Sequence, residues 1–250
     1  MKFDYAKSVL APTEVLTAEA FNELIASQEL RDKMLRVHNA LGDKKEYAIA
    51  KRALPVVMWQ AHFADGKRHS ESAEPSGLYM LDIDHISLVR QAEIRAKAEE
   101  IGLDKLGIYI IHRTPSEEGL RFVSLSPSGL PTAPCHPSPV REGENTSSGG
   151  ERAVKAPTIA ECQQWLAEQL ELLPEEVDTA CKDMARCSFL PSREYFLYIN
   201  PKVFTDRAPL TPPKGGMLHR GSNTRRGSPP TGERGGGRRV PDLLQGHRAD

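Results

Sequence analysis

The sequence predicts an α+β (α/β) fold for residues 1–200, with a mixed sheet flanked by helices and an N-terminal helical segment. Two observations carry this prediction. Of the 250 residues, 39% are hydrophobic, which is enough for one sizeable core. Residues 77–125 read as strand, helix, strand, turn and strand, a succession typical of a sheet covered by helices.

About the first fifty residues have helical periodicity. In AEAFNELIASQ, which follows Thr17, apolar residues recur at helical spacing. A second helix, LRDKMLRVHNAL, is expected to stop at Gly42, and a third, KKEYAIAKRAL, is expected to end before Pro55.

The period then changes to that of strands. VVMWQAHF, Val56–Phe63, predicts a buried strand, and GLYMLDIDHI, Gly77–Ile86, is the clearest strand in the sequence. The amphipathic helix SLVRQAEIRAKAEEIG follows, capped by Ser87 and closed by Gly102. LGIYIIHR and GLRFVSL predict two further buried strands.

Two segments differ in composition from the predicted domain. An insertion at about 126–157 and a tail at 201–250 are rich in Pro and Gly, and we expect both to be disordered. TIAECQQWLAEQLELL, between them, predicts a helix. The tail holds ten Lys/Arg and four Asp/Glu, whereas residues 1–200 hold 23 and 30, so the tail is basic and the domain acidic.

Composition also excludes some classes of protein. No apolar stretch approaches the roughly 20 residues that span a bilayer, and MKFDYAKSVLAPTEV is unlike a signal peptide. The four cysteines lack zinc-ligand spacing, which favours free thiols in a reducing compartment. We therefore expect a cytoplasmic protein that does not contact a membrane.

Asp82 and Asp84 are the first candidate for chemistry. At positions i and i+2 of a strand their side chains share a face, so both carboxylates can converge on a divalent cation. Burial of unpaired carboxylates is costly, which favours a metal, an arginine or water as partner. The alternative is a solvated strand end at which Asp84 caps the next helix.

Two later segments add polar candidates. In TPSEEGLRF, Ser116 and Arg121 could bind a phosphate, although an ordinary hairpin explains the same residues. VDTACKDMARCSFLP offers further acids and an arginine, and its alternative is a solvated helical turn.

Taken in order, these three segments resemble the VirE N-terminal domain family, a primase-polymerase-like module of the archaeo-eukaryotic primase superfamily. KRALPVVMWQAHF also resembles that module, and the resemblance covers about 1–125 and 157–200. It implies an RRM-like, primase-polymerase-like sheet. It also implies the site residues: catalytic and metal-binding acids Asp82, Asp84 and Asp178, with Asp183 as fallback, and nucleotide-binding Ser116, Gly119, Arg121 and Arg186.

The resemblance further implies nucleotidyl transfer during replication of a mobile genetic element. The expected cofactor is Mg²⁺ or Mn²⁺, and the expected partners are nucleoside triphosphates and single-stranded DNA. The sequence contains no GxxxxGK[ST] motif, so a P-loop helicase would be a separate partner or lie beyond this sequence. A template strand needs a basic groove, for which the sequence offers Lys51, Arg52, Lys67 and Arg68, residues that are equally compatible with solvated surface.

Two other functions stay open at this stage. Glu117 stands in the turn expected to face a triphosphate and would repel it, which favours a non-catalytic relative acting as a nucleic-acid-binding or regulatory module. A metal-dependent nuclease or phosphatase would use the same pair of acids, Asp82 and Asp84.

Overall fold

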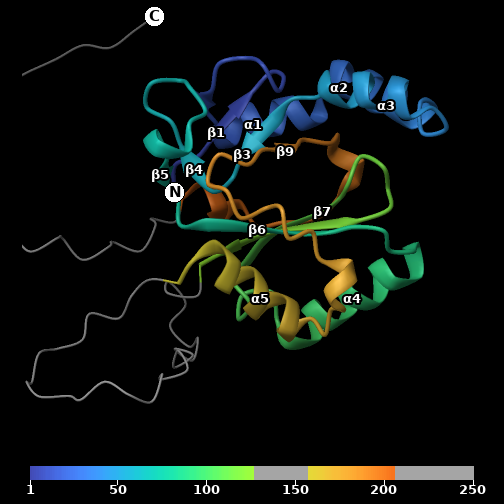
Figure 1. Ribbon diagram of the computed structural model, residues 1–250, viewed down its shortest axis with the longest axis vertical. Coiled ribbons are helices and arrows are strands. Elements are labelled where there is room, and N and C mark those ends of the chain that lie inside the picture. The colour runs from blue at the N-terminus through green and yellow to red at the C-terminus, as the bar shows by residue number, and fades with distance from the viewer. Residues whose placement is uncertain (127–156, 206–250) are drawn as a thin grey trace, which may run out of the picture. The chain divides into compact units, whose positions relative to one another are not determined.

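The computed structural model describes residues 1–126 and 157–205, all within one unit, Met1–Thr211. Its centre is a four-stranded sheet in the order β10-β7-β8-β6 (Figure 1). These strands and the two helices packed on them are β6 (Leu78–Ile83), α4 (Leu88–Ile101), β7 (Ile108–Arg113), β8 (Leu120–Leu125), α5 (Ile159–Gln169) and β10 (Phe196–Ile199). This βαββαβ order confirms the predicted α+β class, and every pairing among the described strands is antiparallel.

A second layer covers the other face of the central sheet (Figure 1). It contains a four-stranded sheet in the order β2-β1-β3-β9, a two-stranded sheet β4-β5 and three helices. Their bounds are β1 (Asp4–Ala6), β2 (Glu14–Val15), α1 (Ala18–Ala26), α2 (Gln28–Asn39), α3 (Lys44–Arg52), β3 (Val56–Met58), β4 (Ala61–His62), β5 (Glu74–Pro75) and β9 (Ser188–Phe189). Short 3₁₀ helices cover Ser70–Ser72, Pro174–Glu176, Arg193–Tyr195 and Pro201–Phe204.

The predicted helices form where the sequence places them, because their caps are in the chain. The side chains of Thr17 and Ser87 accept hydrogen bonds from backbone N–H groups of the first turns of α1 and α4. Helix α4 ends at Gly102, whose positive φ of 107° suits glycine.

Each face of the central sheet has its own hydrophobic core. On one face Met80 and Val123 pack with Phe3, Phe21 and Trp59 of the second layer. On the other face the core joins β6, β7 and β8 to α4 and α5 through residues such as Leu81, Phe122, Ile94 and Leu166. All six residues of β6 are therefore buried, as the continuous apolar run of its sequence indicates.

The structure corrects two details of the sequence prediction. Val56–Phe63 is not one strand: the chain turns at Trp59 and Gln60, so β3 and β4 enter different sheets. The first fifty residues are not helical throughout, since β1 and β2 precede α1. These strands are too short to show a period, and their pairing with each other and with β3 fixes them instead.

The first residues of the predicted tail belong to the folded domain. Pro201–Phe204 packs into the core through buried Val203, so the fold extends past residue 200. The expectation of disorder for 127–156 and 206–250 lies outside the described residues. No helix in the described ranges is long and apolar enough to cross a bilayer.

Strand β6 is an edge of its sheet, yet its outer backbone groups are buried and hydrogen-bonded. The Gln60 side chain accepts from Met80 N at 3.1 Å, and the Gln163 side chain donates to Met80 O at 2.8 Å. Further along, Asp178 N donates to Asp82 O at 2.9 Å. Segments from three distant parts of the chain thus complete the edge, as buried backbone groups require.

Replacing Gln163 by Leu should destabilise the fold. The substitution leaves the buried carbonyls of Met80 and Cys181 without this donor, at a cost of roughly 1–3 kcal/mol. Gln164→Leu is the matched control, because Gln164 is exposed and bonds only Glu168 on its own helix; it should change stability by less than about 0.5 kcal/mol. Urea unfolding of both variants measures the difference in stability. Equal stabilities would contradict the claim that the Gln163 hydrogen bonds stabilise the edge of β6.

Candidate functional site

Three polar residues form a row across the central sheet. Asp82 on β6 lies directly opposite Arg121 on β8, which lies opposite His112 on β7. All three are buried, with exposed fractions of 3%, 8% and 0%. They share the face that turns toward the second layer, because they alternate with the residues of the other core.

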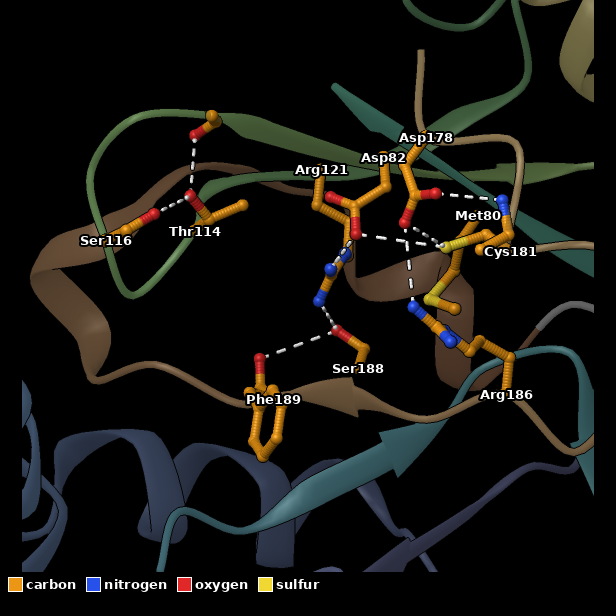
Figure 2. A network of polar contacts seen from close by, with 12 residues as sticks. Met80, Asp82, Thr114, Ser116, Arg121, Asp178, Cys181, Arg186, Ser188 and Phe189 are labelled. Carbon is orange, nitrogen blue, oxygen red and sulfur yellow. Dashed lines mark hydrogen bonds and ion pairs between the residues drawn. The ribbon is translucent and has the colours of Figure 1, made fainter. Parts of the chain in front are cut away.

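Arg121 holds the centre of this row. Its Nη2 donates to Asp82 Oδ2, and its Nη1 donates to Ser188 Oγ on β9 at 2.6 Å (Figure 2). The guanidinium thus links the central sheet to the second sheet. A buried carboxylate needs such a partner, since an isolated one would be strongly destabilising.

Asp178 reaches the same place through backbone pairing. Val177 forms an antiparallel bridge with Ile83, which puts Asp178 beside Asp82 at the end of β6. Arg186 Nη2 lies 3.6 Å from Asp178 Oδ2, so a second guanidinium faces the acids (Figure 2).

Asp84 completes the group of acids at the strand end. Burial, together with the negative charge of Asp82 and Asp178, raises its pKa above the ordinary value. Asp84 N donates to Glu176 O at 3.0 Å, and its carboxyl group lines the same cleft as Asp82 and Asp178. Asp84 follows β6 by one residue, so the two acids predicted at this strand end line one cleft.

Gly119 lies against this strand end. A Cβ atom there would lie 2.3 Å from Ile83 O and 2.9 Å from Asp84 Oδ1, so only glycine permits the close approach. Thr114, in the same turn, shares a 3.1 Å hydrogen bond with Ser116 through their hydroxyl groups (Figure 2). Ser116 lines the cleft, whereas Gly119 contacts Ile83 and Asp84 at the strand end and is outside the lining.

Glu117 does not face the cleft. Its φ of 62° turns the chain, and its Oε1 accepts a 2.8 Å hydrogen bond from the Tyr195 hydroxyl group. The carboxylate lines a separate hollow with residues of α2. The repulsion that the sequence suggested between Glu117 and a bound triphosphate therefore has no geometric basis.

A cleft of about 600 Å³ collects the predicted site residues. Its lining includes all of them except Gly119, namely Asp82, Asp84, Ser116, Arg121, Asp178, Asp183 and Arg186. Asp183 lies outside the group of ligand atoms that Asp82, Asp178 and Cys181 form among the described residues. Its Oδ1 accepts from Ser70 Oγ at 2.7 Å and from Ala185 N at 2.9 Å. The Ser70 hydrogen bond, with that from Ala185, lowers the pKa of Asp183.

The site also includes Cys181 and Ser188, which the sequence motifs did not predict. Cys181 Sγ lies 3.9 Å from Asp82 Oδ2 and 3.7 Å from Asp178 Oδ2, and burial beside Asp82 raises its pKa to about 12. The spacing of Cys181 three residues after Asp178 is the one signal that could have indicated it. Ser188 gave no signal, since only the pairing of β9 brings it to Arg121.

These residues fit a divalent cation. Asp82 Oδ1 is buried and has no hydrogen-bond partner among the described residues, which leaves a lone pair for a ligand. Asp82, Asp178 and Cys181 each offer one ligand atom, and these atoms lie within 4.8 Å of one another. Carboxylates suit Mg²⁺ and Mn²⁺, whereas the thiol adds a preference for softer cations.

Residues 49–194, more than half of the chain, match the family described as BT4734-like, N-terminal domain. The chain belongs to the BT4734-like N-terminal domain family. The match covers every acid and arginine of the cleft named above. No curated protein matches the chain. No solved structure matches it either.

In this BT4734-like domain His112 lies opposite Arg121 on β7, on the side away from Asp82. Its Nδ1–H donates to Arg113 O at 2.8 Å, and its Nε2 has no hydrogen-bond partner among the described residues. Burial, with the positive charge of Arg121, lowers the pKa of His112 to about 4. His112 is therefore neutral at pH 7 and adds no charge beside Arg121.

Gly119→Ala should distort the strand end that carries Asp84. The new methyl group meets backbone oxygen of Ile83 rather than a flexible side chain, so we expect a loss of roughly 1–3 kcal/mol in stability. Gly42→Ala is the control, since a Cβ there meets nothing within 4 Å. The melting temperatures of both variants test this prediction. A Gly119→Ala variant as stable as Gly42→Ala would show that the backbone at the strand end moves to admit the methyl group.

Acidification should destabilise the domain through His112. A histidine with a lowered folded pKa supplies stability above its unfolded pKa of about 6.5, and this is lost as the pH falls toward about 4. At pH 5 the loss due to His112 alone is roughly 2 kcal/mol. His112→Asn should flatten the stability profile between pH 7 and pH 5 by that amount, measured by urea unfolding; a profile as steep as that of the native chain would refute this assignment.

Proposed function

We propose that this BT4734-like domain is a primase-polymerase-like nucleotidyltransferase that acts on nucleoside triphosphates and single-stranded DNA with Mg²⁺ or Mn²⁺. The supporting observation is the meeting of Asp82, Asp84 and Asp178 in one cleft beside two guanidinium groups. Its resemblance to the VirE N-terminal domain suggests replication of a mobile genetic element as the setting and a separate helicase as a partner.

The proposed chemistry divides between the two kinds of charged side chain. Asp82, Asp84 and Asp178 would hold the cation, which when bound would neutralise phosphate charge and promote loss of the proton of an attacking hydroxyl group. The raised pKa of Asp84 supports this assignment, because a bound cation relieves the repulsion among the three carboxylates.

The arginines would serve the phosphates. Arg186 is 44% exposed at its side chain and can turn from Asp178 to a triphosphate, which a guanidinium binds through two parallel hydrogen bonds. Arg121 is fixed by Asp82 and Ser188, so its part is to set the charge and position of Asp82. Ser116 offers a hydroxyl donor at the rim of the same cleft.

A second candidate is a non-catalytic relative that binds nucleic acid. The ion pair between Arg121 and Asp82 favours it, because a guanidinium already neutralises the carboxylate that would bind a cation. Among the described residues Asp82 Oδ1 has no hydrogen-bond partner and Asp84 forms no ion pair, which favours the catalytic proposal instead.

Manganese binding tests the proposal. Asp84→Asn and Asp178→Asn should each weaken Mn²⁺ binding by about 10-fold or more, because each removes a ligand. Asp183→Asn is the matched control: Asp183 lies outside the group formed by Asp82, Asp178 and Cys181 among the described residues, so affinity should stay within about 3-fold. Titration calorimetry gives the affinities, and extension of a labelled primer on a single-stranded template gives the activity.

The same variants carry their own folding control. Asp84 has a raised pKa, so its charged form opposes folding at neutral pH, and Asp84→Asn should melt no lower than the native chain. Strand extension that fails in the Asp84 and Asp178 variants supports the proposal. DNA binding without Mn²⁺ affinity points to the non-catalytic relative, and hydrolysis without extension points to a nuclease or phosphatase; either result overturns it.

A further inference from the structure

Two basic side chains of the cleft have no carboxylate partner. Arg121 and Arg186 are paired with Asp82 and Asp178. Lys51 and Arg68 also line the cleft, but within the described ranges no carboxylate lies at ion-pair distance from either. Unpaired positive charge in a concave site attracts an anionic ligand.

Lys51 is held in place by aromatic rings. It lies in the last turn of α3, and its Nζ is 5.4 Å from the centre of the Tyr47 ring and 5.2 Å from that of Phe189. Cation–π contacts of this kind position the ammonium group without neutralising it. The donors of Lys51 thus stay available for a ligand in the cleft.

Arg68 comes from the loop between β4 and β5 and is partly buried. Its charge lowers the pKa of Asp183 slightly, after larger contributions from Ser70 and Ala185, but the two side chains form no ion pair. Lys51, on α3, and Arg68, in the β4–β5 loop, lie in the second layer, whereas Asp82 and Asp84 lie at the end of β6 in the central sheet.

The basic residues next to Lys51 and Arg68 in the sequence lie outside the cleft. Arg52 follows Lys51 and Lys67 precedes Arg68, yet both neighbours are exposed and neither lines the cleft. The sequence alone made all four equivalent. The fold turns one member of each basic pair into the cleft and leaves the other in solvent.

Phe189 supplies a flat apolar surface beside these cations. It is half-buried on β9, lines the cleft and follows Ser188, the residue that bonds Arg121 (Figure 2). Aromatic rings combined with basic side chains bind nucleotides, because every base can stack on a ring while phosphates contact the cations.

We infer that Lys51, Arg68 and Phe189 form a nucleotide-binding wall of the cleft, distinct from the acids and arginines of the central sheet. The ligand is a nucleotide with its phosphate at Lys51 and Arg68 and its base at Phe189. It is either a free triphosphate or one unit of a single strand. The inference rests on the proposed function, since it names the ligand of that same cleft.

The test compares two double variants with the same loss of charge. Lys51→Gln/Arg68→Gln should weaken binding of oligo(dT) or of dTTP by about 10-fold at moderate salt, while Arg52→Gln/Lys67→Gln should change it by less than about 2-fold. For oligo(dT), the slope of log affinity against log salt should fall by roughly 1.4 in the first variant only, or about 0.7 per lost phosphate contact. Fluorescence anisotropy measures both ligands.

Phe189→Leu separates the base from the phosphates. It should weaken dTTP or oligo(dT) binding by roughly 5-fold or more, because stacking is lost, and change inorganic tripolyphosphate binding by less than about 2-fold, because Tyr47 still contacts the Lys51 ammonium group. Thermal melting confirms that each variant is folded. Loss confined to dTTP assigns the wall to a free nucleotide, and loss confined to oligo(dT) assigns it to a strand; each supports the inference.

Equal effects of the two double variants, or no effect of either, would overturn the inference. Manganese binding keeps this failure separate from failure of the proposed function, because Lys51 and Arg68 touch none of the acids. If Asp84 is needed for Mn²⁺ binding but the Lys51 and Arg68 substitutions leave nucleotide binding unchanged, only the proposed nucleotide-binding wall is refuted. If the protein binds no Mn²⁺ but loses nucleotide affinity when Lys51 and Arg68 are replaced, only the catalytic proposal is refuted.

Discussion

The free edge of β6 is the constraint on which the site depends. Backbone groups on this buried strand must find hydrogen-bond partners, and no further strand of the described sheet supplies them. Gln60, Gln163 and Asp178 do so instead. The bond from Asp178 N to Asp82 O serves the edge and at the same time delivers a third acid to the strand end. The same hydrogen bond therefore completes the edge of the sheet and places Asp178 in the cleft.

The buried charge of Asp82 has a similar double role. Arg121, its partner, also donates to Ser188 and so ties the central sheet to the second layer. His112 on the other flank stays neutral, which keeps a second positive charge away from Arg121. Removing either member of the Asp82–Arg121 pair would leave an uncompensated buried charge, the costlier outcome for such pairs. The pair therefore sets both the geometry of the cleft and its charge.

The family match and the fold cover different parts of the chain. Residues 49–194 include the acids, the arginines and the proposed nucleotide wall, but they leave out β1, α1 and β10. Helix α1 and strand β10 supply Phe21 and Phe196 to the core between the two layers, and Phe3, just before β1, joins them. The matched region carries the candidate chemistry, and the flanking elements complete the central sheet and the core on one of its faces.

The sequence by itself determined most of the helices and strands and the pair of acids. Helical and strand periods, with caps such as Ser87 and Gly102, are local properties, and strand alternation predicts one face for Asp82, in β6, and Asp84, one residue after β6. Only the tertiary structure decided which distant residues join them. Asp178 rather than Asp183 is joined to Asp82 by a backbone hydrogen bond, Glu117 turns away to Tyr195, and Lys51 rather than Arg52 enters the cleft. These choices follow from strand pairing and burial across long separations, which no local pattern encodes.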